Sequence, residues 1–305
     1  MTHVEMLLII LLLDAVLGEP SWLWGRITHP AVLMGRFIGL CDERANHGDN
    51  RRAKGVIVIA ALVLIALVGG WLVALIPDYG LLEILGGAVL LAHRSLIDHM
   101  RDVIRALAEG IAPGRVAVAK IVGRDVSALD ESGVTRAAIE SGAENFSDGV
   151  IAPAFWFLLL GLPGILAYKL INTADSMIGH LDERHREFGW AAAKLDDLVN
   201  WVPARLSGLM ICASGRFKHA FDIMRSDADQ HASPNAGWPE AAMAGSMDIA
   251  LGGPRSYDGE VVQLPWLHSF GRRKLVAADI ATAMTRLWRC WGMVVALMAL
   301  GAVVF

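Results

Sequence analysis

The chain has 305 residues, of which 55% are hydrophobic and 19% are charged, and its mean hydropathy is +0.47. This composition is typical of an integral membrane protein and argues against a water-soluble domain. The formal net charge is −4 and the sequence contains no lysine-rich run, so nothing indicates a nucleic-acid partner.

The apolar segments predict an all-α, polytopic membrane protein with about four spans. The clearest is Gly55–Ile76, whose 22 residues carry no charge and are long enough to cross the hydrocarbon core. A tight turn at Pro77–Gly80 follows, and we expect the return helix to continue as an amphipathic stem through Ile104. The four predicted spans are Met6–Gly18, Gly55–Ile76, Leu81–His93 and Leu287–Phe305.

Basic residues are distributed unevenly between the predicted loops. They cluster in Arg26–Lys54 and in Arg94–Arg124, whereas the short turn at Pro77 has none. Loops rich in lysine and arginine stay on the cytoplasmic side of a membrane. We therefore expect Glu19–Lys54 and Met100–Ser147 to face the cytoplasm, in a multi-pass protein of the cell (inner) membrane.

The middle apolar run is interrupted and admits two interpretations. Val150–Leu160 and Ile165–Ile171 are each too short to span alone, and Gly161–Gly164, which contains a proline, is a strong helix break. A re-entrant helical hairpin would return the flanking polar clusters to one side of the membrane, which suits a shared site. A single crossing is the alternative, and it would place the two clusters on opposite sides.

Carboxylates and amides recur at helical spacing between Glu140 and Arg205. Glu140, Glu144 and Asp148 are spaced i, i+4 and i+8, so they would stripe one face of a helix. Acids beside hydrocarbon are costly, and their concentration points to a metal or ligand site. Such oxygen ligands suit Mg²⁺, which is usually shared with substrate phosphates. The candidate metal ligands are Glu144, Asp148, Asp175, Asp196 and Asp197.

Each acid also has a simpler interpretation, as a helix cap or as the partner of a nearby arginine. One such role does not easily explain three clusters, so we favour the metal site. Lys194 and Arg205 lie close enough in sequence to bind phosphate beside the acids. The sequence has neither a P-loop nor a Rossmann glycine motif.

The segment Ser214–Arg286 is polar and rich in turns, and we expect it to lie on the cytoplasmic side within a single membrane-embedded domain of residues 1–305. His231 lies in a polar, turn-rich context, although a lone histidine is more often structural than catalytic. From the residues by themselves we infer an acid-rich, Mg²⁺-dependent phosphate site. Intramembrane prenyltransferases and CDP-alcohol phosphotransferases fit that description equally well.

Several longer motifs in the sequence allow a more specific interpretation. The segments ESGAENFSDGVIAPAFW, NTADSMIGH, FGWAAAKLDDLVNWVPARL and SPNAGWPEAAMAGSMDIALGGPRSY resemble the adenosylcobinamide-phosphate synthase family of cobalamin biosynthesis (CobD/CbiB). The opening LLLDAVLGEP…HPAVLMGRFI is similar to the start of that family. The likeness runs in order from about Leu11 to Arg273, and several long motifs that recur in order argue against a chance match.

The resemblance implies a membrane enzyme that joins the f-propionate carboxylate of adenosylcobyric acid to 1-amino-2-propanol or its O-phosphate. It implies ATP as a substrate and Mg²⁺ as cofactor. The product would be adenosylcobinamide or its phosphate. Positions carried over by matching motif are Asp14, His29, Glu140, Glu144, Asn145, Asp148, Asn172, Asp175, Ser176, Asp196, Asp197, Asn200, Arg205, His231, Asn235 and Glu240.

These positions, with three residues near them, receive roles as expectations. The catalytic candidates are Asp175, Asp197, Arg205 and His231, the last as a general base. The substrate-binding candidates are Asn145, Asn172, Ser176, Lys194, Asn200, Asn235, Trp238, Glu240 and Tyr257. The sequence differs from the family's motifs at two places that could contact phosphate. Lys194 occupies a position where we expect arginine in the family, and Gln230–Ala232 matches the family motif only loosely.

A corrin is large, flat and rich in amides, so a hydrocarbon-buried pocket would leave its polar groups without partners. We therefore expect it to dock at the cytoplasmic rim against the Ser214–Arg286 segment, with the lipid bilayer as the other partner. The sequence leaves room for a homo-oligomer. One rival function is membrane signalling, because AmpE-type proteins resemble the same superfamily and need no ATP site; the other is the lipid-directed phosphate transfer named above.

Overall fold

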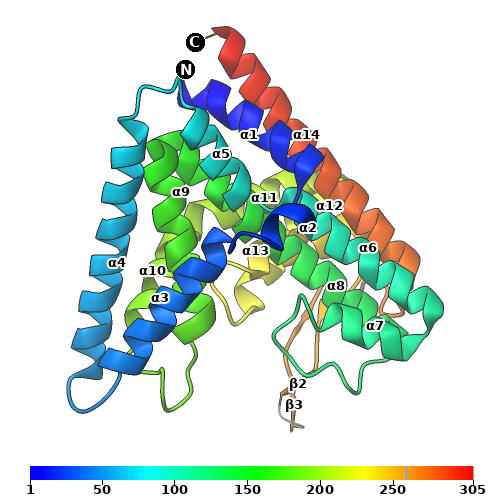
Figure 1. The fold of residues 1–305 in the computed structure, drawn as a ribbon. Helices are drawn as coiled ribbons and strands as arrows, with labels where there is room; N and C mark the ends of the chain where they lie inside the picture. Colours follow the sequence, from blue (N-terminus) through cyan, green and yellow to red (C-terminus); the bar gives the residue numbers. More distant parts are fainter. Residues whose placement is uncertain (258–259, 305) are drawn as a thin grey trace. The chain divides into compact units, whose positions relative to one another are not determined.

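Helices make up most of the chain (Figure 1). The computed structural model describes residues 1–257 and 260–304 and is 73% helical. The prediction of a mainly helical protein is therefore confirmed. The described part also contains four short strands, which the sequence did not predict: β1 (Leu251–Gly252), β2 (Arg255–Tyr257), β3 (Glu260–Val262) and β4 (Trp266–Leu267).

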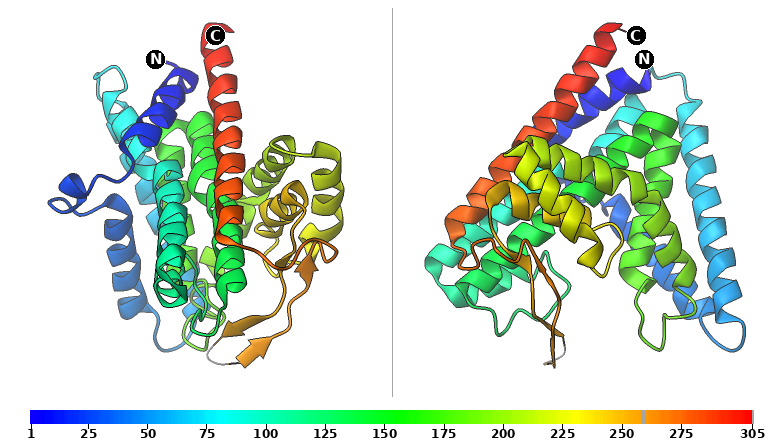
Figure 2. Two further views of the ribbon diagram at one scale, coloured as in Figure 1. Left: turned by 90° about the vertical axis from the view of Figure 1, so that its right-hand side faces the viewer. Right: turned by 180° about the vertical axis from the view of Figure 1, so that it is seen from behind.

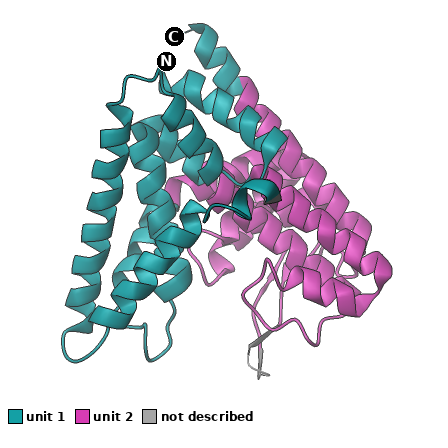
Figure 3. Ribbon diagram, viewed as in Figure 1, with its two compact units in different colours: residues 1–92, 152–200, 297–305 teal, residues 93–151, 201–296 magenta. Residues whose placement is uncertain are grey.

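The chain divides into two compact units, each assembled from separate stretches of sequence (Figure 3). Unit 1 comprises residues 1–92, 152–200 and 297–305. Unit 2 comprises residues 93–151 and 201–296. The expectation that residues 1–305 form a single membrane-embedded domain stays a prediction.

Unit 1 is built around the packing of α4 against α9, which lie side by side in Figure 1. Its core is apolar and draws on α3, α4, α9, α10 and the loop before α10; the fully or nearly fully buried members are Ile38, Ile59, Leu62, Leu170, Ala174, Ile178, Phe188 and Ala192. The helices of unit 1 are α1 (His3–Leu17), α2 (Ser21–Trp24), α3 (Pro30–Ala45), α4 (Arg51–Ala74), α5 (Leu81–Leu90), α9 (Ala152–Ile178) and α10 (Trp190–Val199).

Two glycines let α4 approach its neighbours closely. A Cβ added at Gly70 would lie 2.6 Å from the Cα of Pro163, and one at Gly55 would lie 1.9 Å from the carbonyl oxygen of Phe188. Small residues at helix contacts of this kind are typical of membrane helices, because they let the backbones pack directly. The contact at Gly70 also fixes the turn region of α9 against α4.

The helix break predicted at Gly161–Gly164 is present. Gly161 has φ +66° and ψ −150°, outside the helical region, so α9 consists of two helical halves joined by a kink. In a straight helix, Trp156 and Gly164 would lie more than two turns apart. A Cβ on Gly164 would nevertheless lie only 2.2 Å from the carbonyl oxygen of Trp156, so the kink is sharp. The re-entrance of this bend into a membrane stays a prediction.

The expectation of one continuous helix from Leu81 through Ile104 is wrong. The helix α5 ends at Leu90, and Leu91 has extended dihedral angles (φ −85°, ψ 149°). A new helix, α6, begins at His93, where the chain also passes from unit 1 to unit 2. The apolar and amphipathic periods are both genuine, but they belong to two helices. As a result α5 has only 10 residues, too few to span hydrocarbon unaided.

Unit 2 contains the helices that follow this break. They are α6 (His93–Glu109), α7 (Ile111–Val118), α8 (Glu131–Phe146), α11 (Trp201–Ala213), α12 (Phe217–Asp227), α13 (Gly237–Met247) and most of α14 (Ala277–Val304), with a short 3₁₀ turn at Ala228–Gln230. The yellow-green α12 and the yellow α13 pack against each other (Figure 2). The last helix begins ten residues before the predicted Leu287, because its first turns are polar and carry no span signal.

The carboxylate stripe on α8 is only partly as expected. Glu140 and Glu144 lie one α-helical turn apart, but Ser147–Ile151 forms a π-helical turn. A π turn holds more residues than an α turn, so Asp148 does not continue the α-helical register of the other two acids. Single π turns inside helices are frequently found at functional sites.

The strands of unit 2 form two antiparallel pairs. β1 pairs with β4 through Leu251 opposite Leu267 and Gly252 opposite Trp266, and β2 pairs with β3. Figure 2 shows the second pair in orange, away from the helices of its unit. The segment that the sequence showed to be rich in turns therefore also contains strands, next to Pro254 and Pro265. Two-residue strands are too short to leave a periodic pattern in a sequence.

Among the described residues, three helical stretches are long and apolar enough to cross a membrane: Arg51–Ala74, Ala277–Val304 and the 48-residue run Glu131–Ile178. Only 17% of the most apolar part of α4, and the same share of α14, is buried within the protein. Exposed apolar helix faces of this size are expected to contact lipid or a partner. A membrane association follows, whereas α1 and α5 fall short of a full span.

The Gly70 contact yields a test in which its neighbour is the control. Gly70→Ala should lower the thermal unfolding midpoint in detergent, because overpacking against the Pro163 backbone costs about 1–3 kcal/mol. Gly69→Ala should keep or raise the midpoint, since a Cβ there meets nothing within 4 Å and alanine favours a helix. Equal midpoints for the two variants would contradict the close approach of α4 to α9.

Candidate functional site

In unit 1, the helices α9 and α10 bring together three of the predicted acids. Asp175 comes from the last turns of α9, and Asp196 and Asp197 are consecutive on α10. The amide of Asn172 on α9 donates to Asp196 Oδ1 at 3.4 Å. The two helices pack closely, so the three carboxylates interact electrostatically. This group is called the acid set below.

The three carboxylates of the acid set differ in how far neighbouring groups compensate their negative charge. Burial, together with the neighbouring negative charge of Asp175, raises the pKa of Asp196 to about 7. Lys194 lies 3.0 Å from Asp197 Oδ2, but its side chain is 60% exposed and its attraction is weakened by water. A half-buried carboxylate whose pKa lies near 7, and whose neighbours are also negatively charged, favours the binding of a cation.

Two predicted substrate-binding residues beside the acid set are engaged in bonds within the protein. Asn200 is buried, and its side-chain oxygen accepts a hydrogen bond from the Tyr168 hydroxyl at 2.9 Å. Ser176 donates to the carbonyl oxygen of Asn172 at 2.9 Å, one turn earlier on α9. The Tyr168–Asn200 bond ties α9 to the end of α10, which helps to position the acids, whereas the Ser176 bond lies within α9.

In unit 2, Arg205 on α11 lies between two indole rings. Its guanidinium carbon is 4.2 Å from the ring centre of Trp201 and 4.5 Å from that of Trp238. One of its nitrogens also donates to Asn235 Oδ1 at 3.2 Å and to the Trp201 carbonyl at 2.7 Å. The structure therefore brings Arg205, Asn235 and Trp238 together, as the sequence predicted for a common site.

His231 and Glu240, also predicted, are neighbours in unit 2. His231 Nε2 lies 3.5 Å from Glu240 Oε1, and its Nδ1 accepts a hydrogen bond from the backbone N–H of Ser233 at 3.0 Å. With Nδ1 accepting, the proton of the neutral ring sits on Nε2, facing the carboxylate. This geometry favours His231 as a residue that orients Glu240. Its role as a general base stays a prediction.

A cavity of about 170 Å³ opens beside Glu240. Within it, Glu140 and Arg124 form an ion pair of 2.8 Å whose side chains are only 5% and 11% exposed. The sequence did not single out Arg124 or Ser141, because neither belongs to a helical acid pattern. The cavity is lined by Ile121, Val122, Gly123, Arg124, Glu140, Ser141, Glu144 and Glu240.

The remaining predicted residues are placed as follows. Glu144 lines the 170 Å³ cavity, and Asp148 lies in the π-helical turn, so both proposed ligands belong to unit 2 and not to the acid set of unit 1. Asn145 is exposed and donates to Ser141 at 2.9–3.0 Å. Tyr257 belongs to β2, and its side chain lies outside the described part of the structure.

The acid set fits Mg²⁺ as a partly formed site. Among the described residues, the carboxylate oxygens of Asp175, Asp196 and Asp197 do not converge within 4.8 Å of one another. Mg²⁺ does not require such a cage, because it is commonly held by one or two carboxylates together with water and substrate phosphates. Burial, followed by the negative charge of Asp175, raises the pKa of Asp196, and a bound dication would stabilise the ionised carboxylate against both effects.

Comparison with known proteins places this geometry in context. The family model described as CobD/Cbib protein matches residues 7–287. The chain belongs to the CobD/Cbib family. This membership confirms the resemblance recognised in the motifs. No solved structure matches the chain.

Curated relatives cover nearly the whole chain. A protein of Rhizobium meliloti is 49% identical over 296 residues, which is 92% of this chain and 90% of the relative. One of Sinorhizobium fredii is 48% identical over 299 residues (93% and 92%), and one of Rhodobacter capsulatus is 47% identical over 275 residues (88% of each). All three are named cobalamin biosynthesis protein CobD.

The titration of Asp196 is the first test of the acid set in this CobD/Cbib member. Infrared spectra of metal-free protein should contain a protonated carboxyl band that disappears with a midpoint near the pKa of about 7. Asp196→Asn should remove the band, and Asp175→Asn should lower its midpoint by removing a neighbouring negative charge. The exposed Asp49→Asn is the control. A band that persists in Asp196→Asn would contradict the assignment.

Proposed function

We propose that the chain acts in cobalamin biosynthesis as an ATP-dependent ligase that joins adenosylcobyric acid to 1-amino-2-propanol or its O-phosphate. The names of the curated relatives, cobalamin biosynthesis protein CobD, support the pathway. The main observation that supports an enzymatic function is the acid set, in which the pKa of Asp196 is raised. Carboxylates held together in a half-buried site, with a strongly shifted pKa, are found preferentially at functional sites.

The chemistry explains why such a site needs acids and bases together. A carboxylate does not react with an amine at neutral pH, so the propionate must first be activated, most simply by taking the γ-phosphoryl group of ATP. The amine nitrogen then attacks the acyl carbon, phosphate leaves, and the nitrogen loses a proton. Mg²⁺ held by Asp175, Asp196 and Asp197 would neutralise phosphate oxygens during the transfer.

Cationic side chains provide the complementary part of the proposal. Lys194, exposed beside Asp197, can reach phosphate as a point charge. Arg205 is held rigid between Trp201 and Trp238, and it offers a planar guanidinium with further N–H groups for an anionic oxygen. A pre-positioned cation loses little conformational entropy when it binds phosphate, and that favours charge stabilisation during the reaction.

The 170 Å³ cavity in unit 2 suits the smallest substrate. It is too small for a corrin or a nucleotide, since pockets for drug-sized ligands start at about 300 Å³. Its lining contains Glu144 and Glu240 in addition to the Glu140–Arg124 pair, so it favours a cation. We assign it to the ammonium group of aminopropanol, with Glu240, oriented by His231, taking the proton that the amine releases.

The corrin would dock on the cytoplasmic side, against the polar segment Ser214–Arg286. Trp238 and Trp201 would offer flat surfaces on which it can stack. Trp201 is 54% exposed, as a stacking surface requires. The kink at Gly161 supports a re-entrant hairpin, which together with α4 and α14 makes a multi-pass protein of the cell membrane.

The direct experiment is turnover in detergent with adenosylcobyric acid, ATP and Mg²⁺. Each amine should be supplied in turn, free and phosphorylated, and the product identified by mass spectrometry. We expect corrin- and amine-dependent release of ADP together with an amide product. ATP hydrolysis absent under every combination would favour a signalling protein, and turnover of a prenyl or CDP-alcohol substrate without corrins would favour a lipid transferase.

The acid set predicts which variants lose turnover. Asp175→Asn, Asp196→Asn and Asp197→Asn keep the side-chain size but remove ligand charge, and each should lower kcat by about 100-fold or more while folding is retained. Asp49→Asn, an exposed acid of the same unit, should leave kcat unchanged. Near wild-type turnover of all three acid-set variants at limiting Mg²⁺ would remove these residues from the metal site.

Membrane sidedness tests the hairpin. In a chain whose native cysteines are replaced by serine, Lys120→Cys and Glu183→Cys introduce exposed thiols before and after the kinked run. Both should react with a membrane-impermeant maleimide from the cytoplasmic side of oriented vesicles. Labelling from opposite sides would establish the single crossing and exclude re-entrance.

A further inference from the structure

Three residues outside the acid set converge in unit 2. His219 lies in the first turn of α12, Asp248 directly follows α13, and His268 directly follows β4. One ligand atom from each lies within 4.8 Å of the others, and within the described residues no other group of three histidine, cysteine or acidic side chains meets this condition. None of the three was singled out by the sequence, because their spacing matches no local metal motif.

The distances show how the group is arranged. His268 Nε2 lies 2.7 Å from Asp248 Oδ1, and His219 Nε2 lies 3.6 Å from the same oxygen. The two imidazole rings meet edge to face with centres 5.2 Å apart. His219 Nε2 is buried and has no hydrogen-bond partner, and the same holds for His268 Nδ1. A ring nitrogen buried without a partner beside a carboxylate calls for an explanation.

The backbone holds the group in place at some cost. Asp248 and His268 both have left-handed dihedral angles, with φ +57° and +54°, which residues other than glycine rarely adopt. The His268 N–H donates to Asp227 Oδ2 at 2.6 Å. Gly271 must lack a side chain, because a Cβ there would lie 2.6 Å from His268 Cδ2. Strain that the surroundings enforce is concentrated at functional sites.

We propose that His219, Asp248 and His268 form a binding site for a first-row divalent transition-metal ion of the Zn²⁺ type. Two imidazoles and one carboxylate are ligands that suit Zn²⁺, Co²⁺ or Ni²⁺, whereas Mg²⁺ prefers oxygen ligands. The simpler arrangement, in which Asp248 pairs with the two imidazoles alone, leaves the buried His219 Nε2 at 3.6 Å from the carboxylate, too far for a hydrogen bond. Convergence on a metal ion explains it.

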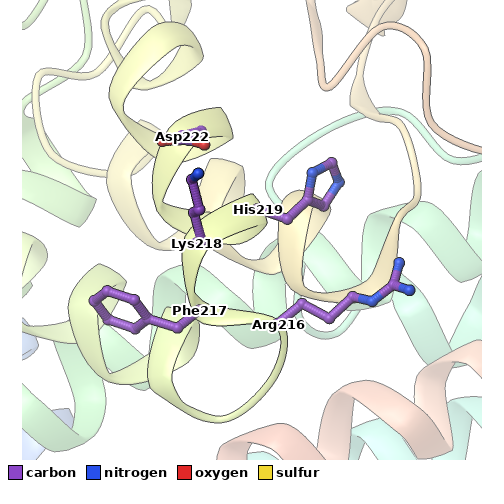
Figure 4. A pocket seen from close by; sticks show the side chains of 5 residues that line it. All are labelled: Arg216, Phe217, Lys218, His219 and Asp222. Atoms are coloured by element: carbon purple, nitrogen blue, oxygen red, sulfur yellow. The ribbon is translucent and has the colours of Figure 1, made fainter.

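Three protein ligands leave a coordination position open. Asp248 is 62% exposed in its side chain and His219 41%, so water or a ligand oxygen can reach the ion. Beside His219 lies an open recess of about 560 Å³ lined by Arg216, Phe217, Lys218 and Asp222 as well (Figure 4). In that view His219 and Arg216 extend to the same side and Phe217 to the other. The cations there favour an anionic oxygen as the fourth ligand.

The bound ion would join α12 to the segments after α13 and after β4. The helices α12 and α13 pack directly against each other, whereas the segment after β4 is held to them by the short β1–β4 pair and by hydrogen bonds such as that from His268 to Asp227. The site is separate from the Mg²⁺ candidates, because it shares no residue with the acid set or with the 170 Å³ cavity. Its occupancy is therefore measurable without an assay of turnover.

The test uses full-length protein in detergent, stripped of metal and freed of any histidine tag. Titration with Co²⁺, followed by its visible absorption, should show one equivalent bound, with Zn²⁺ displacing it and excess Mg²⁺ leaving it in place. His219→Ala and Asp248→Asn should each weaken binding at least as much as loss of an outer partner does, about 10–100-fold. Asparagine tolerates the left-handed backbone, so the second variant changes charge alone.

Two further variants serve as controls. His99→Ala removes an exposed histidine of the same unit, and Asp196→Asn removes a member of the acid set; neither should alter Co²⁺ affinity. Unchanged thermal midpoints in the metal-free state would show that the His219 and Asp248 variants are folded. Absence of stoichiometric Co²⁺ binding, or binding that survives in both His219→Ala and Asp248→Asn, would overturn the proposal.

Discussion

The carboxylate of Glu140 is the constraint on which much of unit 2 depends. It accepts from Arg124 at 2.8 Å and from the backbone N–H of Gly252 at 2.6 Å, so it joins α8 to the loop that precedes it and to β1, 112 residues away. Loss of one partner in a buried ion pair leaves an uncompensated charge and costs about 3–5 kcal/mol. Arg124 and Glu140 line the small cavity, while Gly252 begins the pairing of β1 with β4 that ends beside His268. One buried acid thus supports two separate sites.

Much of the fold was predictable because its signals are local. The uncharged run around α4, the break at Gly161 and the acid spacing on α9 and α10 are each visible within a short window. The break at Leu91 was missed, because an apolar period passes directly into an amphipathic one and no proline or glycine marks the change. The π turn at Ser147–Ile151 was missed for a related reason, since its register follows from packing rather than from composition.

The candidate site shows the same division. Arg205, Asn235 and Trp238 were selected by motif, and they lie in contact. Arg124 was missed, as were His219, Asp248 and His268, because these residues meet through long-range contacts that no spacing records. The stripe of Glu140, Glu144 and Asp148 lies wholly in unit 2, whereas the acid set lies in unit 1, so a metal site shared by both groups stays a prediction. Periodicity specifies a helix face, not the partner of that face.

The glycine contact between α4 and the kink of α9 has a consequence for the biogenesis of the protein. A ribosome completes α4 well before it makes Pro163, because the whole of residues 93–151, which belong to unit 2, comes between them. The Gly70 surface must therefore wait in the bilayer until the kinked run arrives. Unit 1 closes only after part of unit 2 has been synthesised, and it receives its last stretch, residues 297–305, from the very end of the chain. A nascent chain released before Pro163 is made would carry α4 without the helix that covers its Gly70 face.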